Sequence, residues 1–182
     1  LDYGVYISSN NGATWTQSSL NNLWITALVA NGSNIFAATG GNGLYLSTNS
    51  GSNWTQTSFN FNFVWALGIN GNNLYAGVIS GLYYSTNNGT NWVQTTLSYE
   101  PSSLVFNGNN IFVSAGQNGV YVSNDNGLTW APRNEGISSL TINELCIHNN
   151  YLFAGTNNRV YRRPLSELIG IHPIFTEIPN QF

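Results

Sequence analysis

Short apolar segments follow one another along the chain, and turn-forming residues separate them. Residues 25–30 form one such segment, and Asn31-Gly32 then signals a tight turn, because both residue types tolerate positive φ. Further segments follow at 34–38, 43–47 and 54–57. None shows an apolar period of 3.6 residues over a useful length, so no helix is indicated. The pattern predicts four short antiparallel strands and an all-β fold.

This four-strand unit repeats. Tryptophans at 15, 54, 92 and 130 are separated by 39, 38 and 38 residues, and tyrosines at 6, 45, 83 and 121 each follow a glycine and an apolar residue. Hairpin turns and a period near 40 residues are typical of the blades of a β-propeller. One blade buries its faces only against its neighbours, which is why such units come in arrays.

The repeats divide the chain into consecutive blades and a tail. We expect a partial first blade at 1–19, repeats at about 20–58, 59–96 and 97–135, a partial last blade at 136–163, and a linker at 164–182. Both partial blades contain a third strand, so about seventeen strands are expected in an incomplete arc of four to five blades. The faces of its two terminal blades would be covered only by further blades of a parent propeller. Residues 1–182 alone would therefore expose these apolar faces and should self-associate.

A motif precedes each of the four tryptophans. Its first copy reads Ser8-Ser9-Asn10-Asn11-Gly12-Ala13-Thr14-Trp15. It resembles the Asp-box, or bacterial neuraminidase repeat, with the form Ser-x-Asp-x-Gly-x-Thr-Trp, and the resemblance implies a propeller of the sialidase-like superfamily with the motif as a folding element on the outer rim. The matching positions are Asn10, Gly12, Trp15, Asn49, Gly51, Trp54, Asn87, Gly89, Trp92, Asp125, Gly127 and Trp130.

Asp125 is the single acid at the third motif position, and asparagine stands there in the other copies. The substitution is mild, because aspartate and asparagine both cap backbone amides in turns. A calcium site at these turns is an alternative, but it would need several carboxylates in each loop. We therefore expect neither a metal nor a cofactor.

Sialidase-like enzymes bind a substrate carboxylate with three converging arginines. The candidates here are Arg133, Arg159, Arg162 and Arg163. Arg162 and Arg163 are adjacent and would point to opposite faces of a strand, which argues against a triad. Other Asp-box propellers are glycanases with paired carboxylates, for which Glu100 and Glu144 are candidates; the alternative is that both are solvated loop residues.

Cys146 is the single cysteine, and in a strand it would share a face with His148. A nucleophilic cysteine would need an acid to orient that histidine, and the sequence positions none. We interpret Cys146 as a small buried hydrophobic residue. The sequence thus leaves enzymatic activity open and favours a non-catalytic role.

The composition excludes other classes. The chain is 42% hydrophobic, 14% aromatic and 6% charged, with a net charge of −3 and no lysine. A nucleic-acid-binding protein needs many cations, so nucleic-acid partners are disfavoured. No apolar run approaches the ~18 residues of a membrane helix, so membrane insertion is not expected.

The C-terminal segment indicates where the protein is located. Ile178-Pro179-Asn180-Gln181-Phe182 resembles the linker before the C-terminal sorting domain of proteins exported by the type IX secretion system. With the asparagine-rich composition, this resemblance implies a secreted or surface-displayed bacterial protein.

Alignment of the repeats locates a candidate binding region. Variable residues gather at the start of the innermost strand, a region that rings one mouth of a propeller channel. The candidate binding residues are Trp24, Phe63, Trp65, Tyr99, Glu100, Asn143 and Glu144. The aromatic ones could stack on sugars or anchor a protein, or could serve only in packing between blades.

The sequence thus favours a non-catalytic binding or scaffold propeller that recognises a glycan or a protein at the channel mouth. A glycoside hydrolase whose active site lies partly outside these residues is the main alternative. An assembly factor similar to the photosystem-assembly propellers, which carry related repeats, is a third.

Overall fold

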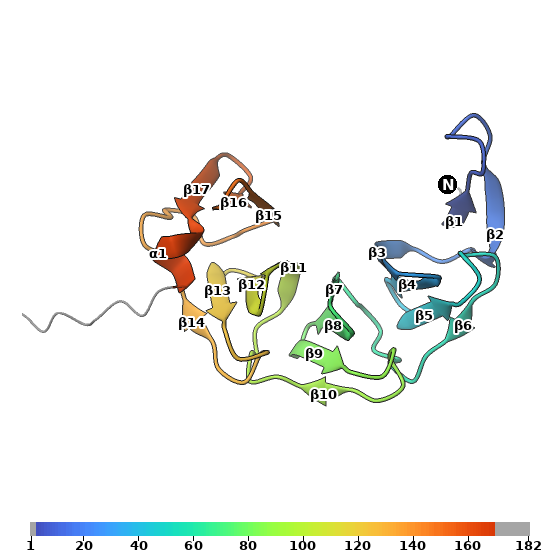
Figure 1. Cartoon of the computed structure of the whole chain (residues 1–182), viewed down its shortest axis with the longest axis horizontal. Coiled ribbons are helices and arrows are strands. Elements are labelled where there is room, and N and C mark those ends of the chain that lie inside the picture. Colours follow the sequence, from blue (N-terminus) through green and yellow to red (C-terminus); the bar gives the residue numbers. More distant parts are fainter. Residues whose placement is uncertain (1–2, 170–182) are drawn as a thin grey trace, which may run out of the picture.

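The computed structural model describes residues 3–169, and these form five antiparallel sheets that follow one another around an open arc (Figure 1). The three middle sheets have four strands each, and every strand pairs with the next one along the chain. Their strands, from the inner side of the arc outwards, are β3 (Ile25–Asn31), β4 (Asn34–Thr39), β5 (Leu44–Ser47) and β6 (Thr55–Gln56); β7 (Ala66–Asn70), β8 (Asn73–Val78), β9 (Gly81–Ser85) and β10 (Val93–Gln94); and β11 (Pro101–Asn107), β12 (Asn110–Ala115), β13 (Val120–Ser123) and β14 (Ala131–Pro132). The predicted all-β fold of four-stranded units is confirmed.

The two sheets at the ends of the arc are incomplete. The first pairs β1 (Gly4–Ile7) with β2 (Thr16–Asn21), which correspond to the third and fourth strands of a complete sheet. The last contains β15 (Glu144–His148), β16 (Tyr151–Gly155) and β17 (Val160–Pro164), which correspond to the first three. The described residues thus form 17 strands, in agreement with the expected number.

A short helix follows the last strand. The sequence assigned residues 164–182 to a linker, but Leu165–Ile169 form α1, and the side chains of Leu165 and Leu168 are buried beside the last sheet. The packed body therefore extends at least to Ile169. The segment Ile178–Phe182, on which the secretion resemblance rests, lies outside the described residues. α1 has five residues and is too short to cross a membrane, and no other helix occurs in residues 3–169.

The hairpins between the two innermost strands explain the Asn-Gly pairs. In the complete sheets Asn31, Asn70 and Asn107 pair with the first residue of the next strand, and the following glycine has positive φ, as a type II′ turn requires. The last sheet uses Asn149-Asn150, both with positive φ, which is typical of a type I′ turn. These turns fix the register, so the same side chains face the same neighbour in every sheet.

Sheets contact one another through an apolar position on the second strand. Phe36 on β4 packs with Leu67 and Leu74 of the next sheet. Tyr75 and Phe112 make the equivalent contacts one and two sheets further along. The core is therefore a series of interfaces between sheets rather than one central cluster.

The motif turns connect the third strand to the fourth, as the sequence predicts. Ser47 Oγ donates to Asn49 Oδ1 (2.9 Å) and accepts from the amide of Gly51 (2.8 Å), and Asn49 Oδ1 accepts from the amide of Asn53 (2.9 Å). The indole of Trp54 donates to the Gly51 carbonyl (2.9 Å) and is half-buried. Membership of the Asp-box family itself stays a prediction.

Cys146 differs from its prediction. It lies on the face of β15 that points away from the rest of the arc, and its side chain is exposed. The apolar run around it suggested burial, but no described sheet covers this face. His148 on the same strand is exposed as well.

Candidate functional site

The starts of the innermost strands gather at one edge of the arc. Trp24 precedes β3, Trp65 precedes β7, Glu100 precedes β11, and Asn143 precedes β15. Because the inner strands of neighbouring sheets lie side by side, these segments form a continuous surface. The sequence alignment had placed its candidate residues here.

Two hydroxyl groups join neighbouring sheets at this edge. Thr26 and Ser102 each stand where the pairing of the inner strand is interrupted by a bulge, which redirects the side chain. Thr26 Oγ1 donates to the Val64 carbonyl of the next sheet (2.5 Å), and Ser102 Oγ donates to the Ile142 carbonyl (2.9 Å). Trp65 occupies the same repeat position in the sheet between them, so this sheet presents an indole where its neighbours use a hydroxyl.

Trp65 is part of an aromatic cluster. Its ring is stacked on Phe63, with centroids 5.2 Å apart and planes 11° apart, and the edge of Trp24 meets Trp65 with centroids 5.8 Å apart. Trp24 is 52% exposed and Phe63 is 43% exposed. The three rings thus contact one another and still present a large apolar surface to solvent.

Glycine is required beneath this cluster. A Cβ atom at Gly40 would lie 2.4 Å from the six-membered ring of Trp24, so any larger residue would displace the indole. The Gly40 amide also donates to the Trp24 carbonyl (2.9 Å), which fixes the segment before β3. Within residues 3–169 the indole nitrogens of Trp24 and Trp65 have no hydrogen-bond acceptor, unlike those of Trp54, Trp92 and Trp130.

A groove of about 360 Å³, lined by apolar and polar residues, continues from Trp65 across the next two sheets. Asn143 is held at its far end, because its side-chain amide donates to Asn157 Oδ1 (2.8 Å) and its backbone amide donates to the Gly155 carbonyl (2.8 Å). The groove is lined by Trp65, Glu100, Pro101, Ser102, Gly116, Gln117, Thr141, Ile142 and Asn143.

The candidates are not all brought together. Trp24, Phe63 and Trp65 form the cluster, and Trp65, Glu100 and Asn143 line the groove. Tyr99 instead packs against Tyr121, with ring centroids 5.3 Å apart, and is absent from the groove wall. Glu144 accepts a hydrogen bond of 2.5 Å from Ser103 Oγ and also lies outside the groove wall.

Sequence reasoning missed Gln117 and Gly116. They belong to the turn between β12 and β13, which reaches the same edge as the start of β11. The sequence candidates were taken from the starts of the inner strands, where the aligned repeats vary, so residues of this second turn were not among them. Gly116 has φ +57°, which explains why a glycine starts the turn.

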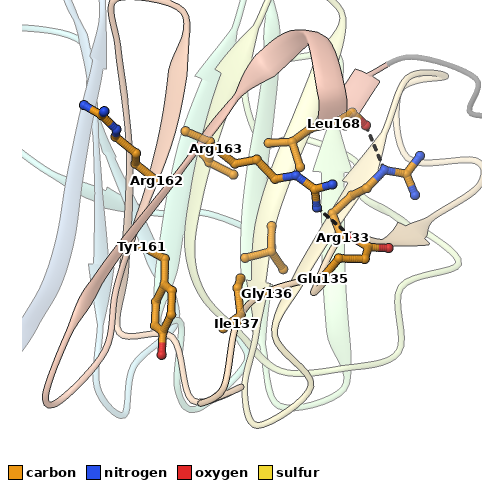
Figure 2. A pocket seen from close by; sticks show the side chains of 10 residues that line it. Arg133, Glu135, Gly136, Ile137, Tyr161, Arg162, Arg163 and Leu168 are labelled. Carbon is orange, nitrogen blue, oxygen red and sulfur yellow. Dashed lines mark hydrogen bonds and ion pairs between the residues drawn. The ribbon is translucent and has the colours of Figure 1, made fainter.

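The chemistry of the groove suits binding. Glu100 is the one ionisable side chain among the residues that line it. Hydrolysis of a glycosidic bond by the usual route needs two carboxyl groups on either side of the bond, and the second candidate, Glu144, is engaged by Ser103. Arg162 and Arg163 point to opposite sides of β17, as their adjacency predicts, so they do not converge (Figure 2).

Neither a family model nor a curated protein matches the sequence. The fold is that of β-propeller proteins among the solved structures. The extracellular domain of a putative one-component system from B. thetaiotaomicron has a TM-score of 0.69 and 18% identity over 87% of this chain. PorZ, a surface component of the type-IX secretion system of Porphyromonas gingivalis, has a TM-score of 0.67 and 14% identity over 92% of it. The GH74 xyloglucanase from Xanthomonas campestris has a TM-score of 0.68 and 18% identity over 90% of it.

These three proteins are longer than the chain described here. The chain covers 24% of the extracellular domain, 31% of PorZ and 33% of the xyloglucanase. At such identities the likeness concerns the fold, which is an arc of propeller blades. Two of the three are described as an extracellular domain and a surface component, and the secreted or cell-surface location expected for this chain stays a prediction.

Proposed function

We propose that the chain is a non-catalytic recognition module that binds a glycan along the inner edge of the arc. Sugar rings would stack on Trp24, Phe63 and Trp65, and their hydroxyl groups would bond to Glu100, Gln117 and Asn143. The observation that carries the proposal is an exposed aromatic cluster that continues, through Trp65, into a groove with several polar side chains. Aromatic walls with a few placed polar groups are typical of small-ligand sites.

The geometry supports an extended ligand. The cluster and the groove together involve four consecutive sheets, from Trp24 before β3 to Asn143 before β15. The indole nitrogens of Trp24 and Trp65 are available to donate to sugar hydroxyls. One carboxylate in the groove can accept hydrogen bonds without repelling an uncharged polysaccharide.

Affinity electrophoresis with soluble polysaccharides tests the proposal. The panel would contain xyloglucan, a β-1,3-glucan, a galactomannan and an anionic pectin, and we expect retardation by at least one uncharged polymer. Trp24→Ala and Trp65→Ala should each weaken binding about tenfold, as expected for loss of a stacking residue at the centre of a site.

Trp15→Ala is the matched control, because Trp15 is 62% exposed and belongs to the outer motif. This variant should bind as well as the unmodified chain. Equal weakening by Trp15→Ala, or retention of binding in both inner variants, would refute the assignment of the site. Release of reducing ends from a bound polymer would favour the hydrolase alternative instead.

A further inference from the structure

The outer edge of the last sheet lacks a part that the complete sheets have. In the middle sheet the fourth strand pairs with the third through Val93 opposite Tyr84 and Gln94 opposite Tyr83. The equivalent residues of β17 are Arg162 and Tyr161. No strand within residues 3–169 pairs with this edge of β17. Its backbone amides and carbonyls are therefore open to an added strand.

In the described part of the chain, the backbone carbonyl of Val160 lacks the hydrogen bond that the equivalent carbonyls accept from the fourth strand. In the complete sheets the carbonyls of Leu44, Leu82 and Val120 accept from the amides of Thr57, Thr95 and Arg133 at 2.8–2.9 Å. Val160 occupies this repeat position. Among residues 3–169 its carbonyl has no such donor, and its side chain is 72% exposed.

A cavity of about 420 Å³ lies beside this edge, between the last sheet and the sheet before it (Figure 2). Apolar side chains from both sheets and from α1 form much of its wall: Val120, Ile137, Leu152 and Leu168, together with the ring of Tyr161. The cavity is thus an apolar site at an unpaired strand edge.

The wall matches the surroundings of a tryptophan elsewhere in the chain. Trp92 packs in a cluster that includes Leu44, Leu74 and Tyr83. Val120, Leu152 and Tyr161 are the residues at those three repeat positions in the last interface. Phe59, three residues after β6, contacts Trp92 with ring centroids 4.2 Å apart, and Ile137, five residues after β14, lines the cavity of the last interface.

Arginines surround this cavity. Arg163 forms ion pairs with Glu135 (2.7 Å) and Glu167 (3.0 Å), and Arg133 donates through Nε to the Leu168 carbonyl (2.8 Å). Arg162 also borders the cavity, and its guanidinium group lies over the ring of Tyr151, 5.0 Å from the ring centroid. Three of the chain's four cationic side chains therefore line this region, in a protein of net charge −3.

We propose that this edge binds an extended peptide by strand addition, with an aromatic side chain in the cavity and a carboxylate on the next residue. In each complete sheet, the third-strand residue equivalent to Arg162 pairs with a residue of the fourth strand, which is Thr55, Val93 or Ala131. The motif tryptophan directly precedes that residue. An acidic residue there would stand opposite Arg162 on the same face of the sheet and form a cross-strand ion pair. The predicted partner is an extended protein segment in which an acidic residue directly follows an aromatic one. Its site is separate from the proposed glycan groove.

The test uses a synthetic peptide with the sequence of residues 90–97 carrying V93E, titrated into the full 182-residue chain by fluorescence anisotropy. We expect saturable binding. The peptide with W92A in addition should bind at least tenfold more weakly, because the cavity loses its occupant. The peptide with V93K in place of V93E should also bind at least fivefold more weakly.

Arg162→Gln in the protein should remove the difference between the V93E and V93K peptides, whereas Arg159→Gln, which removes the same charge from a residue outside the cavity wall, should preserve it. Hydrogen exchange with the bound peptide should slow at the amides of Val160 and Arg162. Absence of saturable binding, equal binding of the W92A peptide, or protection confined to the inner groove would each overturn the proposal.

Discussion

The faces between complete sheets and the faces at the ends of the arc carry the same kinds of residue but differ in burial. Phe36, Tyr75 and Phe112 point toward the next sheet and are at most 1% exposed. Phe153 occupies the same position on β16 and is only half-buried, and no described sheet follows it. At the neighbouring position on the third strand, Leu44, Leu82 and Val120 are at most 1% exposed, against 72% for Val160.

At the beginning of the arc, the exposed residue faces the preceding sheet instead of the following one. Leu67, Leu104 and Leu145 point toward the preceding sheet and are buried, whereas Leu28 at the same position is 50% exposed. The preceding sheet contains only β1 and β2, so the two inner strands that would cover Leu28 are absent from the described part of the chain. Burial at these positions is supplied by the neighbouring sheet, and each sheet is one half of two interfaces.

The largest effect is expected from truncating an aromatic residue at a complete interface. Phe112→Ala removes a fully buried ring and should lower the free energy of unfolding by about 3–5 kcal/mol. Phe153→Ala, its matched control, should cost under about 1 kcal/mol, because little contact is lost. Urea unfolding followed by circular dichroism measures both. Equal losses would show that another surface covers Phe153 in solution.

For the motif tryptophans we expect a similar but smaller difference in unfolding free energy between a buried and an exposed residue. Trp92 is half-buried and contacts the Phe59 ring, so Trp92→Ala should cost about 2–3 kcal/mol, below the range for fully buried aromatic residues. Trp15→Ala should be within about 0.5 kcal/mol of the unmodified chain, as for other exposed positions. A loss under 1 kcal/mol for Trp92→Ala would mean that the motif turn holds without its indole.

The exposed end faces should make the 182-residue chain self-associate. Leu28, Phe153 and Val160 present apolar surface that equivalent residues bury, and such surface promotes association. Sedimentation velocity should show a weight-average mass that rises with concentration. Val160→Lys should reduce this rise. A compact monomer over the whole concentration range would contradict the expectation.

Much of the fold could be predicted from the sequence because local signals repeat with a constant spacing. The predicted strand at 25–30 is β3 (Ile25–Asn31), and that at 43–47 is β5 (Leu44–Ser47). The fourth strands were expected to be longer than the two residues observed, because a propensity pattern does not show where pairing stops. α1 was missed because its five residues are too few for a helical period.

Part of the candidate site could also be located from the sequence. Aligned repeats placed Trp24, Phe63 and Trp65 at one edge, since equivalent positions occupy equivalent places in successive sheets. They could not show that Tyr99 turns toward Tyr121 or that Glu144 bonds to Ser103, because these orientations depend on tertiary contacts. The exposure of Cys146 was missed for the same reason: its burial depends on a neighbour rather than on its own strand.

The smallest effect concerns the third position of the four motif turns, where one copy has an acid and the others have an amide. Asp125 occupies this position in one copy, and asparagine occupies it in the other three. Hydrogen bonds from the Thr129 hydroxyl, the Thr129 amide and the Ser123 hydroxyl lower the pKa of Asp125 to about 2. A carboxyl group whose pKa is lower in the folded state stabilises that state above its unfolded pKa, and this contribution is lost as the pH falls through the folded pKa. Between about pH 4 and pH 2 the unmodified chain should therefore lose stability that Asp125→Asn retains. At pH 7 the two should differ little, since Asn49 and Asn87 make the same bonds to the backbone. Thermal unfolding of both proteins across this pH range measures the difference, and parallel curves would mean that the carboxylate contributes nothing that an amide does not.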